Sequence, residues 1–207
     1  MKSALDIHQA LLSRSVRHEL VRTRSNAASA DDLPRALGVD AQSCVAVRCF
    51  VVDGCRTAKD RAIYLVAVLV LAGDGPDPIS LQRTLGARSV RAATPDEVNL
   101  HTGFSSAFVS PVGLPADVVV LADVALGARD VLYAATGESG VALGIATSDL
   151  LAASGARLAS LTSGPMDVEE LAPWGAAPGT VAQRGEDPAA RVITLEDRRA
   201  SVRRSVS

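Results

Sequence analysis

The sequence predicts one mixed α/β domain followed by an extension with little core. Segments with helical spacing and segments with strand-like alternation are interspersed through residues 1–161, which is typical of this fold class. Hydrophobic residues make up 48% of the 207 residues and charged residues 21%, so the chain can bury a sizeable core. Residues 163–188 contain four glycines and four prolines with few aliphatic residues. We therefore expect a domain over residues 1–162 and a flexible extension over residues 163–207, Gly/Pro-rich and then Arg-rich.

Capping residues indicate where the helices begin and end. The clearest signal lies at residues 94–97, where a threonine cap is followed by proline at the first helical position and, three residues after the cap, by glutamate. We expect this helix to continue to Thr102 and to end at Gly103. Ser3 and Asp6 have the same cap spacing. Similar patterns predict helices over residues 5–12, 33–37, 81–85 and 148–153.

Alternating and β-branched residues predict the strands. Over residues 45–52 every second side chain shares a face, and Arg48 is the only charged residue of this strand. Asp53 and Gly54 open a segment that we expect to be a polar loop up to Arg61, with residues 62–71 returning as the second arm of a long hairpin. Further strands are predicted over residues 16–23, 118–121, 131–135, 141–145 and 157–161.

Composition excludes several classes of protein. The formal net charge of −2 argues against bulk attraction to nucleic acid or anionic lipid, so any such binding needs a local patch. The longest apolar run, residues 62–72, is well below the ~20 residues that cross a bilayer. Three cysteines without a C-x-x-C pair fit a reducing compartment. We expect a cytoplasmic protein with no membrane partner, no metal and no cofactor.

Spacing alone indicates no enzyme class. A serine hydrolase would use Ser105 or Ser106 with His101, but the sequence has no G-x-S-x-G turn. Cys49 lies in a predicted strand and is interpreted as a small buried hydrophobic residue rather than a nucleophile. There is no P-loop and no dinucleotide-binding fingerprint.

The segment over residues 102–114 does indicate a class of enzyme. It reads T-G-F-S-S-A-F-V-S-P-V-G-L and resembles the signature loop of the YbaK-type aminoacyl-tRNA deacylases, the family that includes the editing domain of bacterial prolyl-tRNA synthetases. The resemblance spans residues 1–161. Flanking segments match in the expected order at residues 45–52, 62–71, 81–87, 94–98, 120–123, 134–137 and 147–150.

The resemblance implies both a fold and a reaction. The fold is a mixed β-sheet or barrel surrounded by helices. The reaction is hydrolysis, in trans, of the ester between a small misattached amino acid, of the alanine or cysteine type, and tRNA. Backbone donors in a dry pocket stabilise the oxyanion of such a reaction without a titrating side chain, which agrees with the absence of a triad. The implied partner is the aminoacylated 3′ end of tRNA, and an aminoacyl-tRNA synthetase is a further candidate partner.

The resemblance also assigns site residues. The expected catalytic set is Arg48, Ala107, Ser110 and Pro111. The expected substrate-binding set is Thr102, Gly103, Phe104, Val112, Gly113, Asp123 and Gly137. The expected tRNA contacts are Arg83, Arg88 and Arg91.

Two residues depart from the family pattern. Arg48 stands where the family has a lysine that contacts the terminal nucleotide, and the only lysines are Lys2 and Lys59, outside that strand. Arginine can fork onto phosphate but cannot exchange a proton near neutrality. Ala107 replaces a glycine, and its methyl group would obstruct a backbone with positive φ or a close approach of substrate.

Structural roles remain open beside these assignments. Arg48 can instead be ion-paired at a sheet edge, Asp123 can be a helix cap, and residues 110–113 can form a plain turn. The three arginines near residue 88, and the basic tail over residues 198–204, can be solvated surface. A second function follows from the two departures: a binding module of the same fold, without hydrolysis, for tRNA, a nucleotide-like ligand or a protein.

Overall fold

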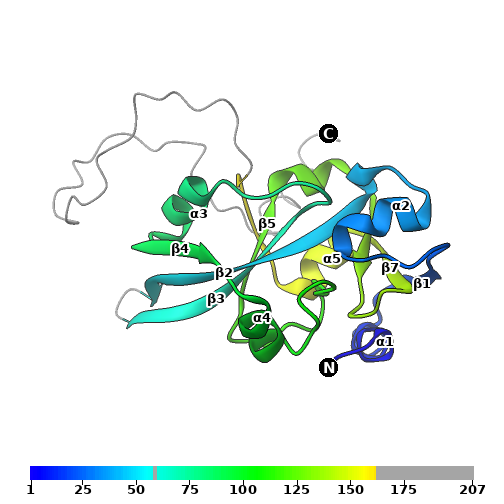
Figure 1. Cartoon of the computed structure of the whole chain (residues 1–207), viewed down its shortest axis with the longest axis horizontal. Helices are drawn as coiled ribbons and strands as arrows, with labels where there is room; N and C mark the ends of the chain where they lie inside the picture. Colours follow the sequence, from blue (N-terminus) through cyan, green and yellow to red (C-terminus); the bar gives the residue numbers. More distant parts are fainter. Residues whose placement is uncertain (58–59, 162–207) are drawn as a thin grey trace, which may run out of the picture.

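A long twisted hairpin forms the centre of the sheet. It consists of β2 (Cys44–Thr57) and β3 (Asp60–Leu71), paired antiparallel from Val45 opposite Leu71 to Thr57 opposite Asp60. The computed structural model describes residues 1–57 and 60–161, and the side chains of residues 55–61 lie outside the description. Figure 1 shows the hairpin crossing the molecule from one side to the other.

Six further strands complete a mixed sheet of eight. The order along the sheet is β1-β7-β6-β2-β3-β5-β8, and β4 pairs with the outer half of β2. β2 runs parallel to β6, and β3 and β8 each run parallel to β5. The bounds are β1 His18–Arg22, β4 Ser89–Ala92, β5 Val119–Asp123, β6 Val131–Ala135, β7 Val141–Ala146 and β8 Arg157–Ala159.

The helix over residues 95–102 begins and ends where its capping signals indicate, whereas the helix predicted over residues 81–85 begins earlier, at Pro78, and is capped by Asp77. Thr94 caps the helix that follows it, with its side chain accepting from the Glu97 N–H, and Gly103 ends that helix with φ of 75°. Asp6 accepts a hydrogen bond from the backbone N–H of Ser3 at 2.7 Å. The α-helices are α1 Ala4–Leu12, α2 Leu33–Leu37, α3 Pro78–Leu85, α4 Pro95–Thr102 and α5 Thr147–Ser154. Short 3-10 turns lie at η1 Ala30–Asp32, η2 Ala41–Ser43 and η3 Val124–Ala128.

The two faces of the central hairpin pack against different helices. Val45 and Val47 face the largest hydrophobic cluster, which contains residues of α1, α4 and α5. Ala46 faces a second cluster under α2, and Val52 faces a third cluster under α3. The alternation predicted for residues 45–52 is confirmed. Over residues 45–52, one face of β2 is thus covered by a single cluster, while the other is covered by two separate clusters, under α2 and under α3.

The structure corrects the sequence prediction at two places. The segment expected as a polar loop from Asp53 to Arg61 is mostly strand, because Asp53 pairs with Ile63 and Gly54 with Ala62. Strand β4 was not predicted, since it has only four residues, too few for a clear hydrophobic pattern, and is mostly exposed. The predicted extension over residues 163–207, with its basic tail, lies outside the described residues. No helix in residues 1–57 and 60–161 is long and apolar enough to cross a membrane.

Candidate functional site

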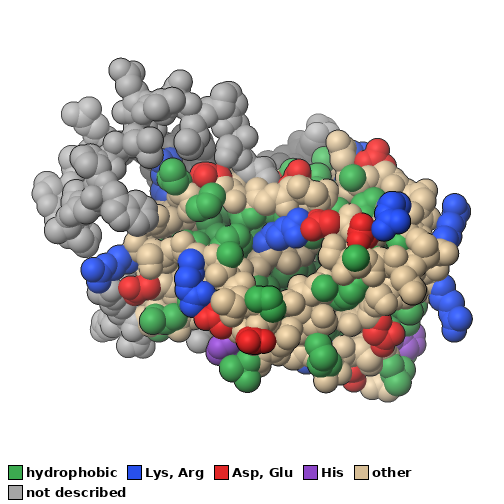
Figure 2. Space-filling view, viewed as in Figure 1, with side chains coloured by type: hydrophobic (Ala, Val, Ile, Leu, Met, Phe, Trp, Pro, Cys, Tyr) green, Lys and Arg blue, Asp and Glu red, His purple; other side chains and the backbone are tan. Residues whose placement is uncertain are grey.

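Arg48 lies on the half-open face of β2, between the clusters under α2 and α3. Its neighbours on this face are Ala46, which is buried in the α2 cluster, and Phe50, which packs against the α3 cluster. The Arg48 side chain is 30% exposed. Figure 2 shows charged side chains of both signs beside hydrophobic ones in a shallow hollow near the middle of this face, between α3 and α2. Arg48, the only charged residue within residues 45–52, is therefore placed where solvent or a ligand reaches the sheet.

The guanidinium of Arg48 is held by two segments distant in the sequence. It donates to both carboxylate oxygens of Asp31, at 2.8 and 2.6 Å, and its Nε and Nη2 donate to the carbonyl of Asp74 at 3.1 and 3.0 Å. Four of its five N–H groups are thus engaged. The carboxylate of Asp31 also accepts from the Gly73 N–H at 2.9 Å. The Arg48 hydrogen bonds hold the pKa of Asp31 below its ordinary value.

The loop over residues 103–113 begins and ends at glycines in the left-handed region. Gly103 has φ of 75° and Gly113 has φ of 81°, conformations that disfavour other residues. Phe104 is fully buried, and it packs with Val109 and Val112 in the cluster of α1, α4 and α5. The loop is thus fixed by apolar side chains on that side of the sheet.

The same loop also reaches the face that carries Arg48. The Ala30 N–H donates to the carbonyl of Ala107 at 2.9 Å, and Phe108 packs with Ala30 and Ala46 in the α2 cluster. Because Asp31 follows Ala30 directly, the segment that holds Arg48 is also bonded to the loop. The structure therefore brings Arg48 and the predicted loop together around residues 30–31.

Several backbone donors of the loop have no partner in the described part of the chain. The N–H groups of Ala107, Val109 and Ser110 donate to none of the described residues, although Val109 and Ser110 are 2% and 0% exposed. Buried backbone N–H groups are paired in more than nine cases of ten. Donors of this kind can stabilise an oxyanion. Ser110 itself accepts the Val112 N–H at 3.2 Å, and Pro111 is buried beside it.

Ala107 is accommodated without backbone strain. Ser15 is the one non-glycine residue of the described chain with positive φ, so Ala107 has an ordinary backbone conformation. Its side chain is partly buried against the α2 cluster. The expected obstruction of a positive φ therefore does not apply to this loop.

Three residues assigned to substrate binding have structural contacts. Asp123 is 1% exposed and caps η3, accepting the N–H groups of Ala125 at 2.7 Å and Leu161 at 2.9 Å, which is the cap role considered for it. Gly137 lies in the β6–β7 turn with φ of 96°, and a Cβ there would lie 2.5 Å from the carbonyl oxygen of Lys2. Its missing side chain makes room for the N-terminal segment. Thr102, also assigned to substrate, is buried and bonds to the Val98 carbonyl.

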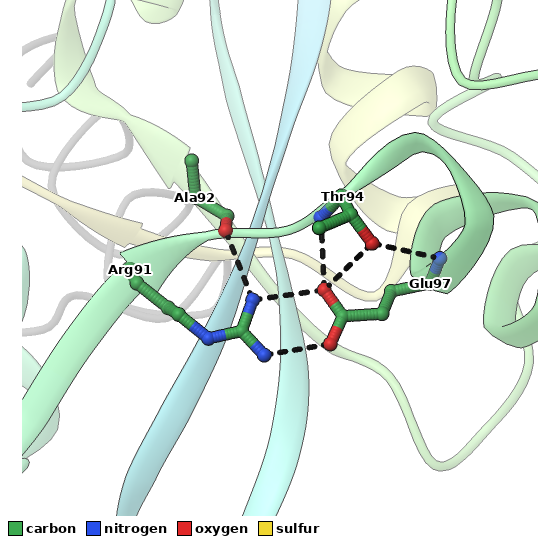
Figure 3. A network of polar contacts seen from close by, with 4 residues as sticks. All are labelled: Arg91, Ala92, Thr94 and Glu97. Carbon is green, nitrogen blue, oxygen red and sulfur yellow. Dashed lines mark hydrogen bonds and ion pairs between the residues drawn. The ribbon is translucent and has the colours of Figure 1, made fainter.

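The three arginines predicted to contact tRNA differ in their surroundings. Arg83 and Arg88 are exposed. Arg91 donates to both oxygens of Glu97, at 2.8 and 2.6 Å, and to the Ala92 carbonyl (Figure 3). These bonds lower the pKa of Glu97 to about 2. Glu97 also accepts from Thr94, so Arg91 braces the cap of α4.

The two cysteines whose side chains the structure describes are poorly suited to nucleophilic chemistry. Burial raises the pKa values of Cys44 and Cys49 to about 12, so both thiols stay protonated near neutrality. Within residues 1–57 and 60–161, no three His, Cys, Asp or Glu side chains gather as a metal site would require.

Sequence reasoning missed two residues, Asp31 and Lys2, that bind the predicted site residues but were not among them. Asp31 precedes a short helix, and this position suggests only a cap. Lys2 lies outside the central strand, and the sequence assigns it no role, yet its ammonium contacts both ends of the loop. Neither partnership has a local sequence signal, since 17 and at least 100 residues separate the groups.

Comparison with known proteins identifies the family. The model of the aminoacyl-tRNA editing domain family matches residues 24–153, which contain Arg48, Asp31 and the loop. The chain belongs to this family. A search of curated proteins finds no match.

Solved structures share the editing-domain fold. One is titled "Crystal structure of a putative trans-editing enzyme for prolyl tRNA synthetase"; it is 27% identical with a TM-score of 0.64, over 78% of this chain and 97% of that one. Another, a hypothetical protein, is 22% identical with a TM-score of 0.66, over 75% and 97%. The predicted mixed α/β class and the resemblance to the editing family are confirmed.

Proposed function

We propose that this editing domain is a trans-acting aminoacyl-tRNA deacylase that hydrolyses the ester of a small misattached amino acid, of the alanine or cysteine type. Family membership supports deacylation of tRNA in general. The relative whose title names trans-editing for prolyl-tRNA synthetase supports action on a tRNA charged in error. A synthetase is a candidate partner and the cytoplasm the expected location.

The observation that carries the proposal is the meeting of Arg48 and the loop at residues 30–31. A 3′-aminoacyl adenosine has a phosphate or ribose side, which suits a cation, and an ester carbonyl, which suits N–H donors. Arg48 keeps one Nη1–H outside its bonds to Asp31 and Asp74. The unpaired N–H groups of Ala107, Val109 and Ser110 lie on the loop that adjoins this segment.

In the proposed reaction, the loop stabilises the charge that develops on the ester. A water oxygen bonds to the carbonyl carbon, and the carbonyl oxygen becomes an oxyanion that accepts from the loop N–H groups. The bond from this carbon to the ribose oxygen then breaks, and a proton from the attacking water goes to that oxygen. Losing one such donor typically slows catalysis by ~10²–10³-fold.

The residues assigned to the site divide into three groups by this reasoning: a catalytic group, a group that forms the loop, and a group that contacts tRNA. Arg48, Ala107, Ser110 and Pro111 remain the proposed catalytic group, acting through position and backbone donors. Phe104, Val112 and Gly113 shape the loop, and Thr102 and Gly103 start it. For tRNA contact, Arg83 and Arg88 are proposed, since Arg91 is committed to Glu97.

The second candidate is a binding module without hydrolysis. The bonds of Arg48 to Asp31 favour it, because they neutralise the charge that the family lysine would present. This version predicts tRNA affinity with a steep salt dependence and no release of amino acid.

A panel of tRNAs charged with wrong amino acids separates the two candidates. With enzyme in excess, we expect free amino acid from alanyl- or cysteinyl-tRNA that carries a proline or related anticodon. No release from any member of the panel would contradict the deacylase. A large gain in release by the Arg48→Lys, Ala107→Gly double variant would indicate that the natural site has lost catalytic power.

A further inference from the structure

Lys2 contacts both ends of the loop over residues 103–113. Its Nζ donates to the carbonyl of Thr102 at 3.1 Å and to the carbonyl of Gly113 at 2.5 Å. Its backbone N–H donates to the carbonyl of Gly103 at 2.8 Å. The ammonium also lies 5.1 Å from the centre of the Phe104 ring, within the range of a cation–π contact. One residue therefore joins the beginning and the end of the loop.

Two of the three carbonyls that Lys2 contacts, those of Thr102 and Gly103, belong to the end of α4. Thr102 is the last residue of that helix and Gly103 is its C-cap. Carbonyls at a helix C-terminus lack partners within the helix and favour a cation. The Lys2 ammonium therefore satisfies a helix end and the far end of the loop together.

The segment that carries Lys2 is itself anchored. The Ala4 N–H donates to the carboxylate of Glu138 at 3.0 Å, in the β6–β7 turn. The Lys2 carbonyl oxygen occupies the space that a side chain at residue 137 would need. Ser3 and Asp6 start α1 directly afterwards. The position of Lys2 is thus fixed by the turn on one side and the helix on the other.

We infer that Lys2 is a positioning residue, which holds the loop in the shape that presents its unpaired N–H groups to the ester. Its contacts lie at the loop ends and at Phe104, whereas the proposed oxyanion donors lie between residues 107 and 110. Lys2 also lies outside residues 24–153, the part that the family model matches. The inference deepens the proposed function, on which its catalytic consequence rests.

Hydrogen exchange tests the positioning role without using activity. In Lys2→Met, a side chain of similar length without donors, amides of residues 103–113 are expected to exchange at least about fivefold faster, while those of α3 and β8 keep their rates. Lys2→Arg, which keeps a charged donor, is expected to restore much of the protection. Arg129→Met, which removes an exposed charge elsewhere, is the matched control. Unchanged exchange in Lys2→Met would overturn the inference.

A second pair of variants perturbs the position of Lys2 from the β6–β7 turn, against which its backbone packs. Gly137→Ala places a methyl group against the Lys2 carbonyl oxygen, and we expect faster loop exchange as in Lys2→Met. Gly140→Ala is its control, because nothing lies within 4 Å of a Cβ at that position. Equal loop exchange in the two variants would contradict the proposed anchoring.

Kinetics distinguish positioning from general stability. A misplaced loop loses interactions made in the transition state, so kcat of deacylation in Lys2→Met is expected to fall about tenfold or more, with KM within about twofold. Lys2→Arg should recover kcat. A rise in KM alone would overturn the positioning role. If the wild type releases no amino acid from any tRNA, the proposed function fails while the exchange experiment still decides the role of Lys2.

Discussion

Arg48–Asp31 and Arg91–Glu97 are two arginine–carboxylate pairs with the same geometry and different surroundings. Both are bidentate with donor–acceptor distances of 2.8 and 2.6 Å. The two residues of the Arg91 pair are six positions apart in the sequence, and the pair stabilises one helix cap. The Arg48 pair connects three separated segments, at residues 31, 48 and 73–74, beside the loop. The geometry of a pair therefore does not reveal its role, whereas the segments that it connects do.

The contrast also concerns exposure. Arg91 is 55% exposed, against 30% for Arg48. Exposed ion pairs contribute little to global stability, so the Arg91 pair mainly secures the start of α4. Arg48 lies in the sheet face, where its position is fixed from both sides. We expect substitutions at the two pairs to separate activity from local stability.

The largest expected effect is that of Arg48→Ala on deacylation. Loss of the guanidinium should lower kcat/KM about 100-fold, or about 2.7 kcal/mol, because the terminal nucleotide loses its cation. Arg91→Ala should change kcat/KM by no more than about threefold. Single-turnover release of amino acid measures both. Equal losses in the two variants would break the distinction between the pairs.

Removing the carboxylate of Asp31 should have an intermediate effect. Asp31→Ala frees the Arg48 side chain to move, and we expect kcat to fall about tenfold because the guanidinium is no longer held in position. Since both substitutions act through one interaction, the Asp31→Ala, Arg48→Ala double variant should be no slower than Arg48→Ala alone. Additive losses would show that Asp31 acts independently. Increased activity in Asp31→Ala would show that the pair restrains the enzyme.

Salt dependence sharpens the comparison between Arg91 and its neighbours. Arg83→Ala and Arg88→Ala should each reduce the slope of log affinity for tRNA against log salt by about 0.7–0.9, the value for one phosphate contact. Arg91→Ala should leave the slope unchanged, because Glu97 already neutralises it. Filter binding of uncharged tRNA at several salt concentrations provides the slopes. An effect confined to Arg91 would reverse the assignment.

The smallest effect concerns pH and the stability of the α4 cap. The pKa of Glu97 is lowered from 4.5 to about 2, so its contribution is fully present above pH 4.5 and is lost as the pH falls through about 2. The difference in unfolding free energy between wild type and Glu97→Gln should therefore be constant from pH 5 to 7 and shrink below pH 4.5. Denaturant unfolding across this range measures it. A difference that grows in acid would contradict the pairing.

Local signals made most of the fold predictable. The caps at residues 94–97 and the alternation over residues 45–52 depend on neighbours in sequence, and the structure confirms both. Strand β4 was missed because it is held by its pairing with β2 and not by its own hydrophobic pattern. The extent of β2 was underestimated for the same reason, since Asp53 and Gly54 favour a turn until the long partner strand is considered.

The site was only partly predictable. The resemblance proposes Arg48 and the loop as parts of one site, and in the structure both contact residues 30–31. The partners that hold them, Asp31 and Lys2, could not be read from the sequence, because their contacts depend on how η1 and the N-terminal segment pack. Gly137 was assigned to substrate binding by analogy with the family. In the structure, a glycine is needed there because a side chain would collide with the backbone of Lys2.

The central claim is that Arg48 and the loop form one site for an aminoacyl adenosine. Titration with 3′-alanylamino-3′-deoxyadenosine, whose amide resists hydrolysis, tests it directly by the chemical shifts of backbone amides. We predict the largest shifts at Ala107, Val109 and Ser110, with loss of binding in Arg48→Ala. Shifts confined to residues outside the loop and the Arg48–Asp31 pair would contradict the claim.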